Sequence, residues 1–463
     1  MITGSFADRI FVRLYVLYLI VDRGMMVMGN PMMSRDRGRL LAGVGLLSIF
    51  TSSFVYMLGV HMLRPIMALY FDSVGYAAVM IGLFASLNAF IPIMFGMPIG
   101  SWIDRMGTRR AVVIGCLLGL LSGVAFMVGS SQGMILIVLL GQVINGVSGM
   151  FAWGALQVAA SLAANQQHNP NKSNHVISNF SFVNSMGQLA GPAVGGVVSD
   201  WGSFQLVFYL FVGLNLLGLV LSMALPAGSY TSRMDKLLAQ EPVQGEAALE
   251  SKQKSKPSSE SGQVKKEPLW KSYGTGYAMM RTNKPFAVAI LLNGILFMLI
   301  DVRTTFFPLF LVNRGLTHTE IGSMLSVAAL AALIVRPLAG YMMNRLGYHR
   351  IMMISIFSGA GCLLALLLNT GYGLLAANVF IWGVCTSVNQ PVALMMVSQT
   401  VKPSERGLGM SIRTMSNRIV QLTNPLLFGM MTTVIGLAGG FGVMGVLLLG
   451  FGVLYHRQSK AKS

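Results

Sequence analysis

Long apolar stretches dominate the chain, and short polar segments separate them. Six stretches precede a polar segment at 227–285, and six follow it. Their approximate bounds are 43–70, 77–102, 111–129, 134–163, 176–199, 204–225, 286–312, 318–343, 351–368, 373–400, 408–435 and 438–455. About 20 apolar residues suffice for an α-helix to cross a bilayer. The pattern therefore predicts an all-α membrane protein with twelve transmembrane helices in two six-helix, pseudo-symmetric halves.

The polar segments divide the chain into five parts. We expect a basic N-terminal segment at 1–42, an N-terminal half at 43–226, a linker at 227–285, a C-terminal half at 286–456 and a basic tail at 457–463. The linker is rich in Ser, Lys, Glu and Gln and has almost nothing apolar to bury. Such a composition predicts a disordered tether, which we place in the cytoplasm.

One segment of the first half recurs in the second. Residues 61–110 match 301–350 at a constant offset of 240 positions. The identical pairs include Gly75 and Gly315, Gly82 and Gly322, Gly100 and Gly340, Arg105 and Arg345, Gly107 and Gly347, and Arg110 and Arg350. Two equivalent halves are typical of secondary transporters, which bind their substrate between the halves near the bilayer midplane. The repeat thus predicts transport of a small molecule.

Composition and loop charge agree with a place in a membrane. Charged residues make up 10% of the chain, against roughly 25% in soluble domains. The net charge of +18 would suggest a nucleic-acid partner in a soluble protein. Here the basic residues lie in every second loop, and the loops between these contain Arg314 as their only basic residue. We therefore expect no nucleic-acid partner. The positive-inside rule predicts that both termini face the cytoplasm.

The loop between the second and third stretches carries a family resemblance. Its sequence, from Gly100 to Arg110, resembles the signature of the major facilitator superfamily, and 336–347 resembles its second copy, with Asn344 in place of the Asp. The resemblance covers about 43–455. It implies an inner gate, in which a loop carboxylate docks at the positive N-terminus of a helix in the other half. The gating residues carried over for this loop and its partners are Asp104, Arg105, Arg109, Arg345 and Arg413.

A second motif lies in the fifth stretch. Residues 187–196 contain Gly191 and Pro192 and resemble the antiporter signature of drug/proton exporters within that superfamily. This resemblance implies a gating role for Gly191 and Pro192 and favours export by exchange over uptake. Simple close packing of small residues is the alternative. The fourth stretch departs from the exporter pattern, because it has Gln142 where those exporters carry an Arg.

Ionisable residues within the stretches are functional candidates, because a charge at bilayer depth is costly unless it is paired or faces a cavity. His61 and Asp301 occupy equivalent positions of the repeat, and we expect them to couple transport to protons. Arg64 and Arg303 are expected to bind a substrate carboxylate. Two alternatives remain: Asp301 and Arg303 forming a structural pair with each other, and His61 making only a packing hydrogen bond. The other predicted substrate-binding residues are Asn145, Trp153, Gln188 and Asn389.

Other chemistry is not visible in the sequence. There is no Gly-rich phosphate loop with Lys and Ser or Thr, and no Cys and His cluster with metal-ligand spacing. We expect no cofactor, no metal and no enzymatic activity.

The leading hypothesis is a monomeric exporter in a bacterial cytoplasmic membrane. It would exchange protons for a small carboxylate-bearing metabolite, such as an opine-type metallophore. The alternatives are a broad-specificity multidrug efflux pump and a transporter-like membrane sensor. The expected partners are the small-molecule substrate, protons and the lipid bilayer.

Overall fold

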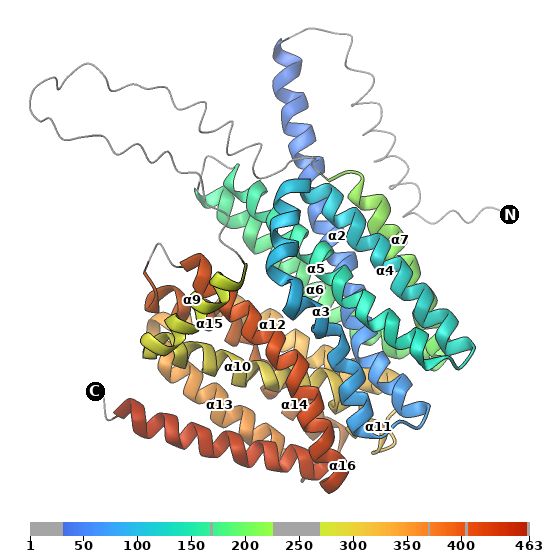
Figure 1. The fold of residues 1–463 in the computed structure, drawn as a ribbon, viewed down its shortest axis with the longest axis vertical. Coiled ribbons are helices and arrows are strands. Elements are labelled where there is room, and N and C mark those ends of the chain that lie inside the picture. The colour runs from blue at the N-terminus through green and yellow to red at the C-terminus, as the bar shows by residue number, and fades with distance from the viewer. Residues whose placement is uncertain (1–30, 167–169, 226–268, 369–370, 403–405, 461–463) are drawn as a thin grey trace, which may run out of the picture.

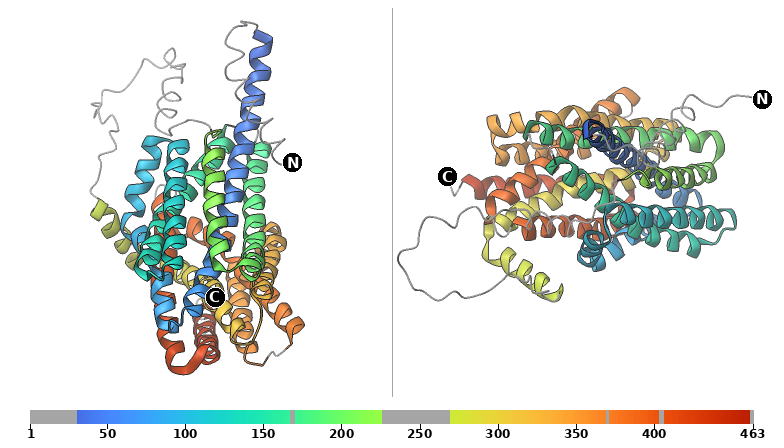
Figure 2. Two further views of the ribbon diagram at one scale, coloured as in Figure 1. Left: turned by 90° about the vertical axis from the view of Figure 1, so that its right-hand side faces the viewer. Right: turned by 90° about the horizontal axis from the view of Figure 1, so that it is seen from above.

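The structure is a computed structural model that describes residues 31–166, 170–225, 269–368, 371–402 and 406–460. All of its elements in these ranges are helices (Figures 1 and 2). The N-terminal half contains α2 (Pro31–Ser73), α3 (Ala78–Met106), α4 (Thr108–Ser131), α5 (Ile135–Asn165), α6 (Pro170–Gly202) and α7 (Phe204–Ser222). The C-terminal half contains α9 (Leu269–Thr282), α10 (Lys284–Thr305), α11 (Phe307–Val312), α12 (His318–Leu346), α13 (Tyr348–Ala365), α14 (Tyr372–Ser387), α15 (Asn389–Thr400) and α16 (Arg406–Lys460).

Ten helices among the described residues are long and apolar enough to cross a membrane. The last of these spans, Leu408–Arg457, contains two helices that meet at Gly436, where the backbone turns out of helical geometry (φ 74°). The predicted stretch 176–199 lies in α6, which is not among the ten because Asn, Ser and Lys residues lower its hydropathy. Dividing the last span at Gly436 and adding α6 accounts for every predicted stretch.

Some predicted boundaries differ from the observed ones. The first helix begins at Pro31, before the predicted boundary at residue 43. The predicted disordered linker extends too far at its C-terminal end, because 269–282 forms α9. This helix follows the polar part of the linker and contains Trp and Tyr residues. Its Gly276 lies against Ile412 of α16, so the segment has a surface to pack on.

Two predicted stretches of the C-terminal half are broken. The stretch 286–312 is interrupted at Phe306, between α10 and α11, and the stretch 373–400 at Val388, between α14 and α15. Each break comes a few residues before a proline, Pro308 or Pro391. Proline has no N–H and its ring crowds the preceding turn, so a continuous helix is disfavoured at these points.

The repeat at an offset of 240 is structural as well as sequential. Gly107 and Gly347 occupy the same turn in the two halves, with φ of 86° and 74°. Residues with a side chain rarely adopt such angles, which explains why both positions are glycine. The prediction of two pseudo-symmetric halves of membrane helices is confirmed.

A second offset, of 233 positions, relates the end of each half. Pro192 lies inside α6 and Pro425 inside α16. Ser203, between α6 and α7, has a φ of 84°, and Gly436, 233 positions later, has a φ of 74°. The two parts of α16 are therefore the counterparts of α6 and α7. This relationship did not emerge from the sequence analysis.

The halves meet along two repeat-related interfaces, in which α3 packs against α16 and α12 packs against α6. Figure 1 shows α3 and α16 together at the end of the bundle opposite to the projecting start of α2. We call this end, which carries Ala78 and His318, the outer end, following the predicted orientation. The described hydrogen bonds between the halves all lie from near the middle of the bundle to its outer end. The described arrangement is thus closed at the outer end.

Candidate functional site

A cavity of about 320 Å³ lies between the two halves. Helices α2, α3, α5 and α6 form one wall, and α10, α12, α14, α15 and α16 form the other. Its polar and ionisable lining residues are Tyr56, His61, Arg64, Asn88, Gln142, Asn145, Trp153, Gln188, Asn293, Thr305, Arg336, Thr386, Ser387, Asn389, Gln390, Asn417, Arg418 and Gln421. The volume matches the lower end of the range for small-molecule sites.

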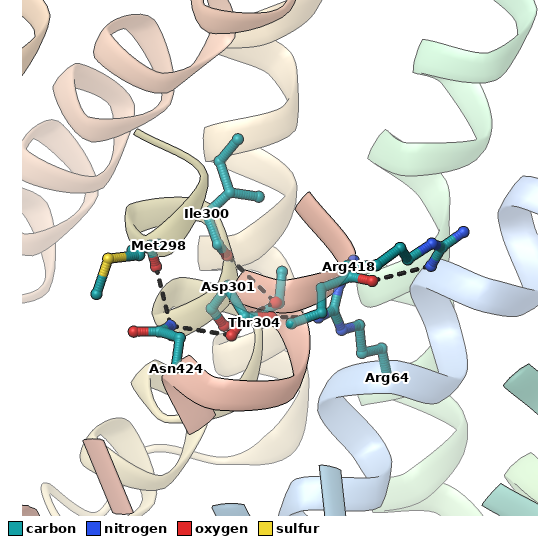
Figure 3. A network of polar contacts seen from close by, with 8 residues as sticks. Arg64, Met298, Ile300, Asp301, Thr304, Arg418 and Asn424 are labelled. Carbon is teal, nitrogen blue, oxygen red and sulfur yellow. Dashed lines mark hydrogen bonds and ion pairs between the residues drawn. The ribbon is translucent and has the colours of Figure 1, made fainter. Parts of the chain in front are cut away.

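An ion pair joins the halves at the cavity wall. Arg64 of α2 donates to the Oδ1 atom of Asp301 in α10. Asn424 of α16 donates to the other carboxylate oxygen, Oδ2, at 2.9 Å. Figure 3 shows Arg64 and Asn424 approaching Asp301 from different helices. The Asp301 side chain is 0% exposed and that of Arg64 is 34% exposed. Arg64 therefore lies between the cavity and the carboxylate.

The alternative in which Asp301 and Arg303 pair with each other is wrong. Arg303 instead donates to the Oγ1 atom of Thr386 at 3.0 Å and lies over the Trp382 ring. Arg303 is not among the residues that line the cavity, and its expected role in substrate binding stays a prediction. Successive residues of an α-helix are separated by about 100°. A side chain two positions after Asp301 therefore faces α14 instead of α2.

The cavity carries positive charge. Besides Arg64, it is lined by Arg336 and Arg418, whose described partners are neutral. Arg336 donates to Ser185 at 2.8 Å and to Gln188 at 3.1 Å, and Arg418 donates to Gln421 at 2.9 Å. Among the described residues that line the cavity, none is Asp or Glu. Three guanidinium groups thus face it, with one covered carboxylate behind Arg64.

Most of the predicted binding residues are brought together. Asn145, Trp153, Gln188 and Asn389 line the cavity with Arg64, and so does His61, three residues before Arg64 on α2. Trp153 stacks between Tyr56 and Phe180, at ring separations of 6.1 and 5.8 Å. This stack gives the N-terminal wall an aromatic surface beside its polar groups.

Asn424 is a site residue that sequence reasoning missed. It lies inside the predicted stretch 408–435, and nothing in its local sequence sets it apart. At the offset of 233, the counterpart of Asn424 in the first half is Gly191 of the exporter-like motif. An alignment of the two halves at this offset would have shown that the second half has an amide side chain at the position where the first half has glycine.

The predicted gating residues fall into two groups. Arg105 and Arg345 are exposed, and Arg345 lies over the Tyr341 ring. Arg109 and Arg413 are half-buried. The side chain of Asp104 lies outside the described residues, so its expected contact with the start of the eleventh stretch stays a prediction.

The exporter-like motif is buried where α6 passes between α2 and α12. A Cβ at Gly191 would come within 2.8 Å of the Met62 backbone nitrogen in α2. The Pro192 carbonyl lies against Gly322 of α12, where a Cβ would be 2.3 Å from its oxygen. Close packing of small residues is therefore what this motif achieves in the described arrangement.

Comparison with known proteins places these features in context. The chain is 20% identical over 409 residues to an uncharacterized MFS-type transporter of Methanocaldococcus jannaschii, covering 88% of this chain and 96% of that protein. It is 26% identical over 196 residues to the quinolone resistance protein NorA of Staphylococcus aureus, a match that covers 41% of this chain and 47% of NorA. The similarity to NorA is thus confined to less than half of each protein.

Solved structures share the fold. A peptide transporter POT in complex with sulfate is 16% identical and has a TM-score of 0.67, with 90% of this chain and 94% of the other covered. The nucleoside transporter NupG is 14% identical and has a TM-score of 0.65, with coverage of 91% and 99%. The Major Facilitator Superfamily profile matches residues 49–367 and 289–463. The chain therefore belongs to the Major Facilitator Superfamily, and it is a multi-pass membrane transporter.

Proposed function

We propose that the protein exports a small carboxylate-bearing molecule across a bacterial cytoplasmic membrane in exchange for protons. Alternating opening of the two halves would expose the cavity to each side in turn. The exporter-like motif around Gly191 and Pro192 and the similarity to NorA support export. An opine-type metallophore is one carboxylate of the required kind.

The observation that carries the proposal is the Arg64–Asp301 pair. Arg64 is the exposed partner, so a substrate carboxylate in the cavity competes with Asp301 for its guanidinium group. Once Arg64 turns to the substrate, Asp301 is a buried carboxylate without its counter-charge. Breaking a buried pair in this way typically costs about 3–5 kcal/mol. Asp301 then requires a compensating positive charge. A cationic group of the substrate would supply this charge in place of a proton, so that substrate and proton oppose each other's binding and are exchanged.

Transport by the purified full-length chain in proteoliposomes tests this proposal. The probe is a fluorescent quinolone that carries a carboxylate and a secondary ring amine, chosen because of the NorA relative. We expect a pH gradient to drive the quinolone against its concentration gradient. Binding of the quinolone without gradient-driven movement would contradict the proposal and favour the sensor alternative. If the pH gradient does drive transport, metabolite profiling of medium from a deletion strain would identify the natural substrate.

Broad multidrug efflux is the second candidate. It is favoured by the aromatic surface formed by Tyr56 and Trp153 and by two further rings in the lining, Phe71 and Phe297. The two candidates differ in how they depend on Arg64. A carboxylate transporter should lose its substrates in Arg64→Gln, whereas a multidrug pump should still move cationic and neutral aromatic compounds.

A further inference from the structure

We infer that the substrate carries a basic nitrogen as well as a carboxylate, and that the α10 wall of the cavity binds this nitrogen. The binding groups are the side-chain oxygens of Asn293 and Asn389. This inference rests on the proposed exchange and names the substrate class for the same cavity.

The first argument is the sign of the coupling. A substrate with only a carboxylate binds Arg64 best when Asp301 is protonated, so proton and substrate strengthen each other's binding. The two would then move together in one direction. Exchange requires each to oppose the binding of the other. A cationic nitrogen bound elsewhere on the same wall provides this opposition, because its charge stabilises the ionised form of Asp301 and so disfavours protonation of that carboxylate.

The second argument is an excess of hydrogen-bond acceptors on this wall. Asn293 and Asn389 line the cavity and are 1% and 2% exposed. Their Nδ2 atoms have acceptors: Asn293 donates to Asn417 at 2.6 Å, and Asn389 donates to the Asn293 carbonyl at 3.4 Å. Their Oδ1 atoms are buried without a donor among the described residues. A buried acceptor without a partner is unfavourable, and a substrate N–H group supplies the donor.

The spacing on α10 fits one extended ligand. Asn293 precedes Asp301 by eight residues, and Phe297 and Ile300 line the cavity between them. At 1.5 Å per residue, Asn293 lies about 12 Å from Asp301 along the helix, so the nitrogen site is separate from the Arg64–Asp301 pair. Arg64, Arg336 and Arg418 come from other helices. The cavity thus has a guanidinium side for the carboxylate and an acceptor side for the nitrogen.

Equilibrium binding to the purified full-length protein tests this inference. The probes are the fluorescent quinolone with its secondary amine and its N-acetylated derivative, which keeps the carboxylate but lacks the N–H group. We expect Asn389→Leu and Asn293→Leu to weaken binding of the amine about tenfold and to leave the N-acetylated probe unchanged. Asn389→Asp should strengthen binding of the amine only. Asn184→Leu is the matched control, because Asn184 is buried but does not line the cavity.

The outcomes separate the two proposals. Equal effects on both probes, or failure of both to bind the wild-type protein, would overturn the nitrogen site. Selective effects on the amine combined with a failure of the pH gradient to drive transport would contradict only the exchange mechanism.

An independent observation at the outer end carries a second inference. Asp200, at the end of α6, accepts hydrogen bonds from the backbone N–H groups of His318 and Thr319 at 3.1 and 2.7 Å. These residues begin α12, in the other half. The His318 ring nitrogen Nδ1 lies 3.3 Å from the same carboxylate, and its ring packs on Phe204. A carboxylate at a helix N-terminus satisfies free N–H groups and complements the helix dipole.

The opposite interface repeats this arrangement. Thr433, 233 positions after Asp200, accepts from the backbone N–H of Val79 at 3.2 Å. Val79 is in turn 240 positions before Thr319. A helix end of each half thus caps the first turn of a helix in the other half. We propose that Asp200 and Thr433 form a two-part outer latch, which must break on both sides before the cavity opens outward.

The two parts differ in charge. Burial by itself would raise the pKa of Asp200, but the hydrogen bonds from Thr319 and His318 outweigh burial and hold this pKa below its ordinary value. Asp200 is therefore ionised at neutral pH, while Thr433 is a neutral acceptor. Hydrogen bonds to charged groups are stronger than neutral ones. The Asp200 side is thus the stronger part of the latch.

Distance measurements between fluorophores on Ser131 and Leu368, in the outer loops of the two halves, test the latch in the full-length protein. The three native cysteines are first replaced by alanine. We expect Asp200→Asn to raise the ratio of outer-open to outer-closed molecules about tenfold, and Thr433→Val about threefold. The control Thr423→Val changes an exposed hydroxyl that bonds only within its own helix. An unchanged ratio in the Asp200→Asn, Thr433→Val double variant would overturn the latch.

Discussion

Gly82 of α3 lies directly against the carbonyl oxygen of Pro425 in α16, and a Cβ at residue 82 would come within 2.1 Å of that oxygen. Gly322 and Pro192 form the same contact between α12 and α6. These positions bring one half close to the other because a hydrogen atom replaces a side chain. Closure of the outer end therefore depends on two glycines that the repeat relates to each other.

Replacing either glycine should hold the halves apart. We expect Gly322→Ala to favour the outer-open form and to lower turnover at least fivefold, because the backbone of Pro192 cannot yield to a methyl group. Gly340→Ala is the control, since a Cβ there meets nothing within 4 Å. The measurement is the same inter-loop distance, together with transport rates. Equal inter-loop distances and transport rates in the two variants would show that closure of the outer end does not depend on the close contact between α12 and α6.

Asp301→Asn should abolish gradient-driven export while leaving passive exchange detectable, because the amide cannot bind and release the coupling proton. Asp72→Asn provides a control on α2, where Asp72 is only half-buried near the outer end. Proteoliposomes with and without a pH gradient give the comparison. His61→Gln should shift the pH dependence of transport. Gradient-driven export that survives loss of both His61 and Asp301 would assign these residues a structural role.

Arg64→Gln should weaken binding of a carboxylate probe by about 1.5–3 kcal/mol, the range for a hydrogen bond to a charged group. Arg303→Gln should have a smaller effect, because Arg303 bonds to Thr386 and does not line the cavity. Titration calorimetry with the quinolone and its methyl ester measures both effects. The methyl ester lacks the carboxylate, and its affinity should not depend on Arg64.

The inner gate gives a separate prediction. Asp104→Asn should lower turnover much more than substrate affinity, because the predicted gate would stabilise the outward-facing state without contacting the substrate. Transport rates at saturating probe, compared with binding constants, separate the two quantities. If the Asp104→Asn variant turns over at the wild-type rate, the charges of this loop determine only the topology of the protein in the membrane.

Orientation can be tested by cysteine labelling. A cysteine at Ser255, in the central linker, should react only with membrane-permeant reagents in intact cells. A cysteine at Ser131, which is exposed at the outer end, should react with impermeant ones. The reverse pattern would invert the inside and outside assigned to the latch, the gate and the direction of export.

The local sequence was enough to predict the helices from their apolar runs, the two halves from the repeat, and the family from the loop motif between Gly100 and Arg110. An apolar run of spanning length has few alternatives to a helix in a bilayer, because every backbone polar group must be satisfied within the segment. The glycines of the repeat at 61–110 and 301–350 mark turns that recur in the structure, so the offset of 240 was readable from the sequence. Six of the polar and ionisable residues singled out in the apolar stretches line the cavity, namely His61, Arg64, Asn145, Trp153, Gln188 and Asn389.

Only the tertiary structure decided which of these residues meet. Asp301 pairs with Arg64 and not with Arg303, because the choice depends on how α2 and α10 are rotated across the cavity. The offset of 233 is carried by backbone geometry and a few scattered residues, so it became visible only when α6 and α16 took equivalent places. Asp200 has its role only because α12 of the other half brings its first turn to this carboxylate. Such partners are hundreds of residues apart or on opposite halves, and no local pattern encodes the packing that joins them.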